Sequence, residues 1–408
     1  MSKIAEMIKE LCPKGIEKEK LGDCSNIING FAFQSKKYVT NGIRVVRISD
    51  VQDGYISNED QKYYPLTEEN SIKPFILQED DLVISLTGNV GRVAFIPKEM
   101  LPAALNQRVA CLRAKNNATI KYIFYELYNK KFQKKAMENA NGAGQKNLST
   151  TWLTNYMIPL PPLSIQQEIV SVLDSFTTLI DKMKKEVEMR KKQMECYCDE
   201  LYGGDFKGLM NLANIPGCSV IRFSELGTIT RGKRFVRDDI RESGQPCIHY
   251  GDMYTYYGTK ASKAKTYLDT DFPKKMRYAH KGDVVIVGAG ENDYDIGVGL
   301  VWMGDEPAAV HDACYILEHS QSPMYISYYL RSNIYHQQLK PYVSSGKISS
   351  FSADGLGKVY IPIQPKEKQQ EIVRILNTFE TYISKLEKLI ALRQKQYEYY
   401  REKLLTFE

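Results

Sequence analysis

The sequence contains no run of about 18 apolar residues, so it lacks a segment with the length and composition of a membrane-spanning helix. The stretch from Met1 to Gly15 has neither the apolar core of about seven residues nor the small-residue cleavage site of a secretory signal peptide. These two absences predict a cytoplasmic protein.

Paired cysteine motifs are also missing. None of the eight cysteines shows the spacing of a zinc site or of a disulfide framework. Cys196 and Cys198 stand within a predicted helix, where their thiols point to different faces. Cys111 and Cys314 lie in similar runs, Ala-Cys-Leu and Ala-Cys-Tyr, and we expect them to be equivalent buried strand positions of two repeats. We interpret the cysteines as reduced structural thiols.

Catalytic motifs are the third absence. The sequence has neither the Asn-Pro-Pro-aromatic tetrad of an amino-methyltransferase nor a Gly-x-x-x-x-Gly-Lys-Ser/Thr phosphate loop. The glycine-rich segments 142–146 and 288–290 lack the required spacing between a strand and a helix. The segment His311 to Cys314 is expected to alternate along a strand, which points its side chains to opposite faces. The sequence therefore predicts no catalytic or metal site, and no enzyme.

The composition is that of a folded, moderately basic protein. Its 408 residues, 43 % of them hydrophobic, suit two or three domains with real cores. A net charge of +6 favours a polyanionic partner without identifying one. Tyrosine is common, with 28 copies against 14 of phenylalanine, and it suits a hydrogen-bonding surface that still offers flat apolar area.

A long helical stretch occurs twice. The first copy begins at 166–170 (Gln-Gln-Glu-Ile-Val) and runs to about Leu201; the second begins with the same letters at 369–373 and runs to about Leu404. In both, apolar residues recur at alternating steps of four and three, which is the heptad pattern of a coiled coil. Each member of the second seam follows its partner by 203 positions (372 minus 169), and one arginine repeats with the rest. The two seams comprise Ile169, Leu173, Phe176, Ile180, Met183, Val187 and Arg190, then Ile372, Leu376, Phe379, Ile383, Leu386, Ile390 and Arg393.

The globular parts repeat as well. The run 80–84, which turns into a buried strand, is answered by 282–286, and Leu21-Gly22 is answered by Leu226-Gly227. Loops between these shared segments differ in length, as expected for a scaffold whose loops carry the specificity. We predict an α+β fold: two mixed domains, each a small sheet with flanking helices, joined by a two-helix coiled coil. The predicted boundaries are 1–160 and 204–363 for the two domains, and 161–203 and 364–408 for the two spacer helices.

Local signals add detail to this plan. The stretch from Tyr122 to Glu138 is interpreted as one helix. Ser164, with Gln167 three residues later, is interpreted as a capping box at the start of the first long helix.

At this point the sequence resembles a known family. A globular half, the entry Ile-Pro-Leu-Pro-Pro-Leu at 158–163, the Gln-Gln-Glu-Ile-Val helix start, a heptad helix, and then the same plan again are similar to the DNA specificity subunit of type I restriction-modification systems. The resemblance spans essentially the whole chain. It implies that the two long helices lie antiparallel as a spacer, which gives the α+β fold an antiparallel coiled coil under approximate two-fold symmetry. It implies that each globular half is a target recognition domain that reads one half of a split, asymmetric site in double-stranded DNA.

The resemblance also implies partners. Two adenine methyltransferase subunits would dock on the frame of this chain, and motor-nuclease restriction subunits would join them. It implies no cofactor bound by this chain; S-adenosylmethionine, ATP and magnesium would belong to the partner subunits.

Residue types that contact DNA are abundant on the predicted loops. Lysine and arginine bind phosphates, while arginine, amides, hydroxyls and aromatic rings read or stack on bases. The densest run, from Arg231 to Arg237, places four cations in seven residues. In the first half the candidates are Asn29, Phe31, Lys36, Lys37, Arg47, Ser49, Thr87, Asn89, Arg92, Gln107, Arg108 and Lys146. In the second half they are Arg231, Lys233, Arg234, Arg237, Tyr250, Tyr254, Tyr256, Tyr257, Lys260, Asn292, Tyr294 and Lys347.

Plainer interpretations of these residues stay open. A charge run is often a solvated surface, and the tyrosines from 254 to 257 suit an aromatic strand packed on its own domain equally well. For the whole chain, one alternative is a coiled-coil scaffold whose ends bind proteins or glycans. Another is an enzyme whose site is assembled from both halves, but that requires convergent acid, base or metal groups, which the sequence does not show.

Overall fold

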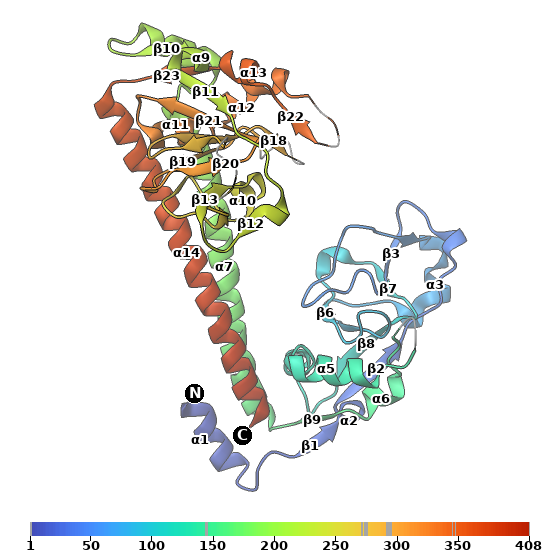
Figure 1. The fold of residues 1–408 in the computed structure, drawn as a ribbon. Helices are drawn as coiled ribbons and strands as arrows, with labels where there is room; N and C mark the ends of the chain where they lie inside the picture. Colours follow the sequence, from blue (N-terminus) through green and yellow to red (C-terminus); the bar gives the residue numbers. More distant parts are fainter. Residues whose placement is uncertain are drawn as a thin grey trace. The chain divides into compact units, whose positions relative to one another are not determined.

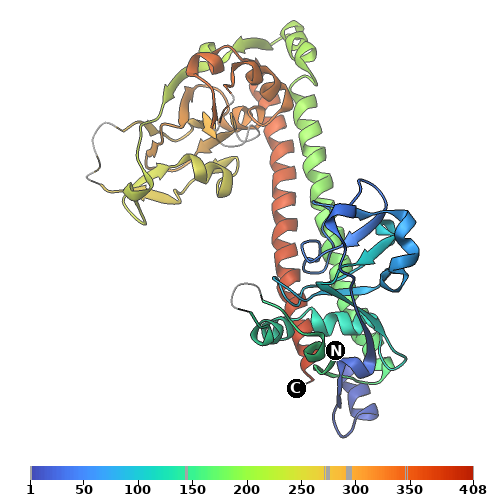
Figure 2. The same ribbon diagram turned by 90° about the vertical axis from the view of Figure 1, so that its right-hand side faces the viewer.

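In the computed structural model, the chain divides into two compact units. The first unit comprises Met1–Lys182 with Ile390–Glu408, and the second comprises Met183–Leu389. The structure describes residues 2–407 except 143–145, 271, 273–275, 291–295, 345 and 347. Each unit holds part of both long helices, α7 (Leu163–Leu201) and α14 (Lys366–Thr406), as Figures 1 and 2 show.

The first unit is built on two small sheets. Its larger sheet is antiparallel in the described part of the chain, with the strand order β2-β8-β5-β6, and the smaller has the order β4-β3-β7. Successive residues of β5 point to opposite faces: Leu82 and Ile84 pack against α4, α5 and α6, whereas Val83 packs toward the smaller sheet. The elements are α1 (Ser2–Leu11), β1 (Lys18–Lys20), α2 (Leu21–Cys24), β2 (Ser25–Asn29), β3 (Ile43–Val46), β4 (Tyr63–Tyr64), α3 (Glu69–Ile72), β5 (Leu82–Ser85), β6 (Val93–Phe95), β7 (Ala103–Leu105), β8 (Val109–Ala114), α4 (Ile120–Leu127), α5 (Lys130–Asn139), α6 (Thr150–Thr154) and β9 (Met157–Pro159).

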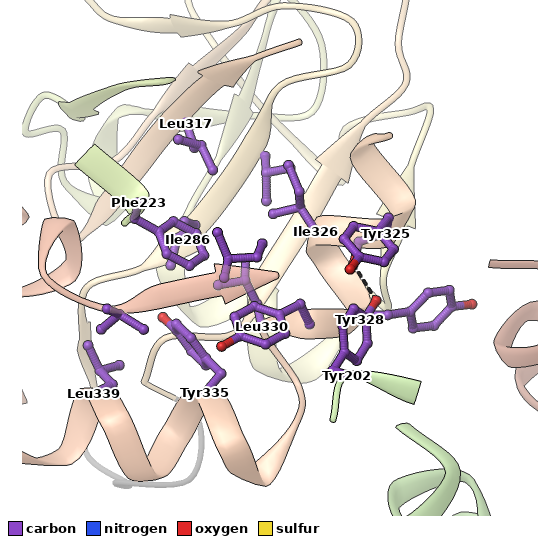
Figure 3. Close-up of a cluster of buried hydrophobic side chains, with 14 of the residues drawn as sticks. Tyr202, Phe223, Ile286, Leu317, Tyr325, Ile326, Tyr328, Leu330, Tyr335 and Leu339 are labelled. Carbon is purple, nitrogen blue, oxygen red and sulfur yellow. Dashed lines mark hydrogen bonds between the residues drawn. The ribbon is translucent and has the colours of Figure 1, made fainter. Parts of the chain in front are cut away.

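The second unit repeats this plan. Its two larger sheets have the strand orders β11-β21-β17-β19-β14 and β12-β15-β13-β20-β16 among the described residues. One face of β17 packs on an aromatic core that includes Tyr325 and Tyr329 of α11, part of which Figure 3 shows. The elements are α8 (Phe206–Asn211), β10 (Ser219–Arg222), α9 (Phe223–Leu226), β11 (Gly227–Arg231), β12 (Ile240–Arg241), β13 (Gln245–Ile248), α10 (Tyr250–Thr255), β14 (Lys260–Ala261), β15 (Thr266–Leu268), β16 (Tyr278–Ala279), β17 (Val284–Val287), β18 (Ala289–Gly290), β19 (Gly299–Trp302), β20 (Ala308–Val310), β21 (Cys314–His319), α11 (Pro323–Tyr329), α12 (Asn333–Leu339), β22 (Ser349–Ser350), α13 (Ala353–Gly357) and β23 (Tyr360–Ile363).

The long helices pack antiparallel within each unit. In the first unit, the ring of Phe176 stacks on that of Tyr400, with centroids 5.5 Å apart. In the second, Tyr197 packs on Phe379, and Lys191 pairs with Glu387 at 2.9 Å. The predicted α+β fold with tandem repeats and a heptad coiled coil is therefore confirmed.

The seam residues named from the sequence are buried or half-buried in α7 and α14. The two seam arginines find partners on their own helices. Arg190 donates to Glu186 at 2.9 Å and lies over the ring of Tyr382, while Arg393 donates to Gln396 at 2.7 Å. Among the described residues, neither arginine forms an ion pair across the seam.

The repeated Gln-Gln-Glu-Ile-Val motif has a structural explanation in its first glutamine. Gln166 is buried, and its side-chain amide donates to the carbonyl oxygen of Pro161 at 2.8 Å. Gln369, 203 positions later, is also buried and donates to the carbonyl oxygen of Gln364 at 2.8 Å. The side-chain oxygen of Gln166 accepts a backbone N–H just before α4, and that of Gln369 accepts one just before α11. The glutamine therefore fixes the start of each long helix to its globular domain. The predicted capping box is wrong, because Ser164 lies inside α7, whose first-turn N–H groups bond to Pro162.

One other local prediction is wrong, and so is one alternative interpretation. The expected helix from Tyr122 to Glu138 is broken into α4 and α5, because Asn129 caps a new helix by accepting the backbone N–H of Phe132 at 2.8 Å. The tyrosines from 254 to 257 do not form a strand, since α10 (Tyr250–Thr255) covers the first two of these positions.

The expected equivalence of Cys111 and Cys314 is wrong by two residues. Cys111 pairs with Val83 in the ladder of β5 and β8, whereas Cys314 pairs with Val287 in the ladder of β17 and β21. Both are buried. The segment from His311 is also not a strand, because β21 begins only at Cys314 and a turn precedes it.

Strand pairing likewise corrects the expected match of Leu21-Gly22 with Leu226-Gly227. α2 and α9 are corresponding four-residue helices, each followed directly by a strand. Leu21 begins the first and Phe223 begins the second, so these two buried residues correspond.

Candidate nucleic-acid interface

Each unit gathers its candidate loops at one end of its sheet, which we call the loop edge. In the first unit, the loop edge comprises residues 29–37, 47–52, 87–92, 106–108 and 146–147. It is formed where β2 and β5 end and where β8 and β6 begin. In the second unit it comprises residues 231–237, 249–257 and 311–313, at the corresponding ends of β11, β13 and β21.

A glycine allows the backbone to turn closely at the same place in both units. A Cβ at Gly30 would lie 2.1 Å from the carbonyl oxygen of Asn106, and one at Gly232 would lie 2.2 Å from that of His311. Neither distance is sterically possible, so a side chain cannot be accommodated without moving the backbone. Asn106 and His311 both accept the backbone N–H two residues onward, at 3.3 and 3.1 Å, which shapes the same tight turn before β8 and β21.

In the first unit, backbone bonds draw the loops together. The N–H of Gln107 donates to the carbonyl oxygen of Phe31 at 2.9 Å, and that of Leu86 donates to Arg108 at 2.9 Å. The hydroxyl of Thr87 donates to the side chain of Asn147 at 3.1 Å. The structure therefore brings together candidates that lie far apart in the sequence. Phe31 differs from the other candidates, because its ring packs on Phe33 and Phe75 and so belongs to a local hydrophobic core.

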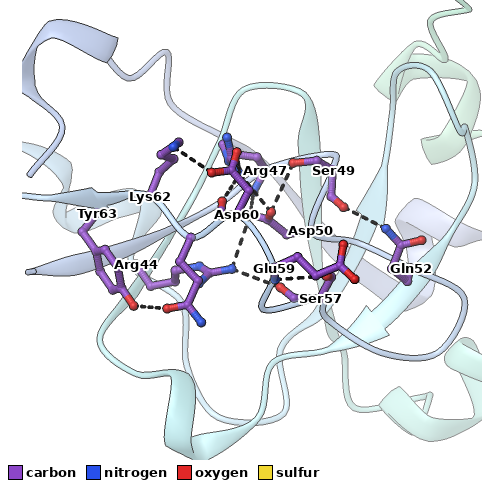
Figure 4. Close-up of polar contacts among 11 residues, drawn as sticks. Arg44, Arg47, Ser49, Asp50, Gln52, Ser57, Glu59, Asp60, Lys62 and Tyr63 are labelled. Atoms are coloured by element: carbon purple, nitrogen blue, oxygen red, sulfur yellow. Dashed lines mark hydrogen bonds and ion pairs between the residues drawn. The ribbon is translucent and has the colours of Figure 1, made fainter. Parts of the chain in front are cut away.

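Arg47 lies in a dense polar network (Figure 4). It pairs with Asp50 and Asp60, both at 3.2 Å, and Asp50 is buried beside Arg44 at 3.8 Å. Hydrogen bonds from Lys62 and Arg47 lower the pKa of Asp60 below its ordinary value. The network ties the segment after β3 to the segment before β4. Arg47 therefore stabilises the conformation of its own loop through these two ion pairs.

The other cations of the first unit differ in how strongly they are engaged. Lys37 pairs with Glu68 at 2.7 Å, and the guanidinium of Arg92 donates to Gln52. Lys36, Arg108 and Lys146 are exposed, and none of the described carboxylates forms an ion pair with them. Asn29, Ser49 and Asn89 are exposed on the same edge. This edge therefore offers both free cations and hydrogen-bonding groups.

In the second unit, the predicted cation run surrounds a buried anchor. Arg231 ends β11, and its Nε donates to the carbonyl oxygen of Asp312 at 2.7 Å. Phe235 is only 2 % exposed and packs into the sheet, which fixes the loop that carries its charged neighbours. Three cations of this run are exposed, and no described carboxylate pairs with them: Lys233, Arg234 and Arg237.

Two histidines that the sequence did not single out for DNA contact lie against this loop. The rings of His249 and His311 are 4.8 Å apart, and the ring of Phe235 is 5.0 Å from that of His311. Burial lowers the pKa of both histidines; Asp252 opposes the shift at His249, and His249 adds to the shift at His311. Both rings are therefore neutral near neutral pH, and the positive charge of this edge comes from its arginines and lysines.

The remaining candidates of the second unit fall into three groups. Tyr250 packs on the two histidine rings and Tyr256 is 61 % exposed, so these two rings belong to the loop edge. Tyr257 is buried and accepts the backbone N–H of Lys265 at 2.7 Å. Lys260 is exposed on β14, an edge strand of the sheet that also contains β11 and β21. Asn292, Tyr294, Lys347 and the side chain of Tyr254 lie outside the described part of the structure.

Other residues at the loop edges were missed from the sequence. Arg277 donates to the carbonyl oxygen of Arg231 and is exposed beside it, although 46 positions separate the two. Gln52 and Asn147 contact the candidates Arg92 and Thr87 in the first unit. Only strand pairing brings these residues together, and no local pattern in the sequence signals it.

A metal site and a membrane-spanning helix are both absent from the residues that the structure describes. No group of three or more histidine, cysteine, aspartate or glutamate side chains could hold a metal ion within those residues. No helix in the described part of the chain is both long and apolar enough to cross a membrane.

The fold and its two loop edges define a protein with tandem recognition domains. The model of the type I restriction modification DNA specificity domain matches residues 13–189 and, a second time, residues 217–394. A putative type I restriction enzyme specificity subunit of Haemophilus influenzae is 28 % identical over 332 residues, which cover 74 % of this chain and 76 % of that protein. The EcoR124I/EcoR124II specificity subunit of Escherichia coli is 27 % identical over 331 residues, which cover 72 % of each chain.

Solved structures agree on the fold. The crystal structure of a type I S subunit from M. genitalium aligns with a TM-score of 0.53 at 16 % identity, covering 95 % of this chain and 96 % of that one. The chain therefore belongs to the family of type I restriction-modification specificity subunits, with two tandem DNA specificity domains. Membership supports the prediction that it is a recognition component and not an enzyme.

Proposed function

We propose that the chain reads a bipartite, asymmetric DNA site, each half with one loop edge. The observation that carries this proposal is that one backbone frame presents different side chains in the two units. The turn at Gly30 is followed by Phe31, whereas the turn at Gly232 is followed by Lys233. A constant frame with variable polar loops is how one scaffold reads two unrelated half-sites.

Within this proposal, the domains comprise residues 1–160 and 204–363, and the loop-edge residues divide by chemistry. Exposed cations such as Lys36, Arg108, Arg234 and Arg237 suit phosphates, which set position and orientation. Exposed amides and hydroxyls such as Asn29, Ser49 and Asn89 suit base edges. The buried groups beneath them keep the loops in shape.

We also propose that two methyltransferase subunits dock on the coiled coil and that motor-nuclease subunits join the complex. Apolar side chains on the outer faces of the long helices support this. Leu392 and Tyr399 of α14 are 62 % and 59 % exposed in the first unit, and Tyr382 and Leu389 are 44 % and 40 % exposed in the second. Such stripes are typical of helices that pack on further helices. S-adenosylmethionine, ATP and magnesium would be bound by those partners, which act in the cytoplasm.

The test is to co-express this chain with the methyltransferase encoded beside it and to map methylated adenines across the host genome by single-molecule sequencing. One split motif, with two specific blocks around an unspecified gap, is the expected result. A stable complex that methylates nothing would contradict the reading function and favour a scaffold that binds other partners.

To assign half-sites, residues 231–237 would be replaced by those of a relative with a different motif. Only one block of the methylated motif should change. A change in both blocks would contradict the assignment of one half-site to each unit.

A further inference from the structure

The first unit contains a cleft that the loop edge does not include. It lies between α5, β9 and the last turns of α14, all within that unit, and it encloses about 210 Å³. Five cations line it, namely Lys18, Lys130, Lys131, Lys135 and Arg401, with the carboxyl group of Glu126 among them.

The same space is filled in the second unit. Tyr329, the counterpart of Glu126 203 positions later, is buried, and its hydroxyl accepts from Gln338 at 2.9 Å. Tyr202, the counterpart of Leu405, packs on the rings of Tyr325 and Tyr329. Its hydroxyl donates to the carbonyl oxygen of Tyr325 at 2.6 Å (Figure 3). The scaffold can therefore close this space with aromatic side chains, and in the first unit it does not.

The positive charge of the cleft is also specific to the first unit. Helix position and strand pairing identify a counterpart for each of its five cations, and every counterpart is uncharged. For Lys18, Lys130, Lys131, Lys135 and Arg401 in turn, these are Val220, Asn333, Ile334, Gln338 and Cys198. The framework does not require these cations, because the second unit folds in the same way without them.

Two of the ionisable groups, Arg401 and Glu126, lie deep in the cleft. Arg401 is 8 % exposed and lies over the rings of Tyr128 and Tyr397, 5.2 Å from each, and no described carboxylate forms an ion pair with it. Glu126 is 5 % exposed and accepts from the hydroxyl of Tyr122 at 2.9 Å. Burial raises the pKa of Glu126 to about 8, so near neutral pH it is a neutral hydrogen-bond donor and does not cancel the cations. Glu398 and Glu402 offset the five cations only in part.

The cleft faces away from the loop edge. On the loop-edge side of α5, Gln133 donates to Asp53, the residue directly after the loop-edge segment 47–52, at 3.1 Å. Lys131 and Lys135 are each two residues from Gln133, about 200° around the helix, and so lie on its opposite side. The cleft and the loop edge therefore lie on opposite sides of α5, and the apolar Met157 and Leu405 in the wall of the cleft suit the stem of a side chain.

We propose that this cleft binds a carboxylate-bearing side chain from an acidic segment of a protein partner. The cations and the neutral Glu126 supply charge-assisted hydrogen bonds to the carboxylate, and the apolar wall contacts its methylene stem. The site is independent of DNA reading and goes beyond it.

The test uses the full chain and hexaglutamate as the probe, with binding measured by calorimetry at about 0.15 M salt. The cleft variant is Lys131→Ile with Lys135→Gln, which installs the residues of the second unit. The control is Lys134→Gln with Lys184→Gln, which removes two exposed lysines that do not line the cleft. We expect the cleft variant to bind hexaglutamate about tenfold more weakly than the wild type, and the control to bind like the wild type.

Three results would overturn the proposal. Equal losses in the cleft variant and the control would show general attraction to a basic protein. Inorganic phosphate binding as tightly as hexaglutamate, with the same loss in the cleft variant, would make the cleft a small-anion site. Displacement of hexaglutamate by a duplex of unrelated sequence would assign the surface to DNA. Methylation mapping reports on the loop edges separately, so failure here leaves DNA reading as a distinct question.

Discussion

Glu126→Gln should stabilise the first unit, and the gain should depend on pH. The folded pKa of Glu126 is about 8, against an ordinary value of 4.5, so between these values the folded state holds a proton that the unfolded state has released. Stability is therefore full below the ordinary pKa and falls as pH rises toward the folded one. Between the ordinary pKa and pH 7, the free energy of unfolding falls by an amount on the order of 3 kcal/mol, at 1.36 kcal/mol per pH unit. Glutamine has a similar shape, remains neutral and still accepts from Tyr122, so it avoids this loss.

Differential scanning calorimetry measures the effect, with hydrogen exchange of α4 assigning the transition to the first unit. Near neutral pH the melting temperature of that transition should rise by about 6–12 °C, because a unit of this size shifts by about 2–4 °C per kcal/mol. At about pH 4.5 the gain should vanish. Glu138→Gln on α5 is the matched control and should change little, since Glu138 is exposed and its one ion pair among the described residues is with Lys134 at 3.9 Å. A gain of equal size at both pH values would refute the burial argument.

Three further predictions concern the loop edges and the second unit. Gly30→Ala should destabilise the first unit by at least about 2 kcal/mol in urea unfolding, because overpacking against a backbone carbonyl is costly. Gly258→Ala, whose Cβ would meet nothing nearer than 3.7 Å, should be close to neutral. Arg234→Gln with Arg237→Gln should weaken binding to the mapped DNA site. The slope of log K against log salt concentration should fall by about two, since two phosphate contacts are lost. A changed methylation motif would contradict phosphate contact. Acid should open the second unit before the first, because burial lowers four histidine pKa values there; stability present above about pH 6.5 is lost as pH falls. Hydrogen exchange at about pH 5.5 and 7.5 should show faster opening at the lower pH near these four residues: His249, His311, His319 and His336.

Periodic signals in the sequence predicted the elements whose shape is decided locally. The heptad seams specified both long helices, and the apolar run at Leu82 specified β5, because side-chain periodicity follows directly from backbone geometry. The break between α4 and α5 was missed although Asn129 carries a capping signal, since apolar residues on both sides continue the helical pattern. A short polar residue within such a pattern deserves weight as a boundary.

Strand register could not be predicted in the same way. Cys111 and Cys314 occur in similar runs, yet their partners across the ladder differ, because register is set by the pairing of distant strands. The same limit applied to the candidate interface. Arg47 looked available from the sequence, but its partner Asp60 comes from a segment 13 positions away, and only the fold brings them together. Composition indicated which residue types would be present at the loop edges. It did not indicate which of them already form ion pairs or hydrogen bonds within the fold.

The contrast between Glu126 and Tyr329 shows how two copies of one frame can separate stability from binding. At that position the second unit has a tyrosine that completes an aromatic core, whereas the first has a carboxyl group that must give up its charge to be buried. Closing the space with aromatic rings would remove that cost, since apolar burial carries no charge penalty. The first unit therefore keeps a destabilising buried carboxyl group at a position where the second unit has a stabilising aromatic ring. Residues that lower stability in this way are expected at surfaces that bind a partner. The five cations around Glu126 indicate the sign of what it binds.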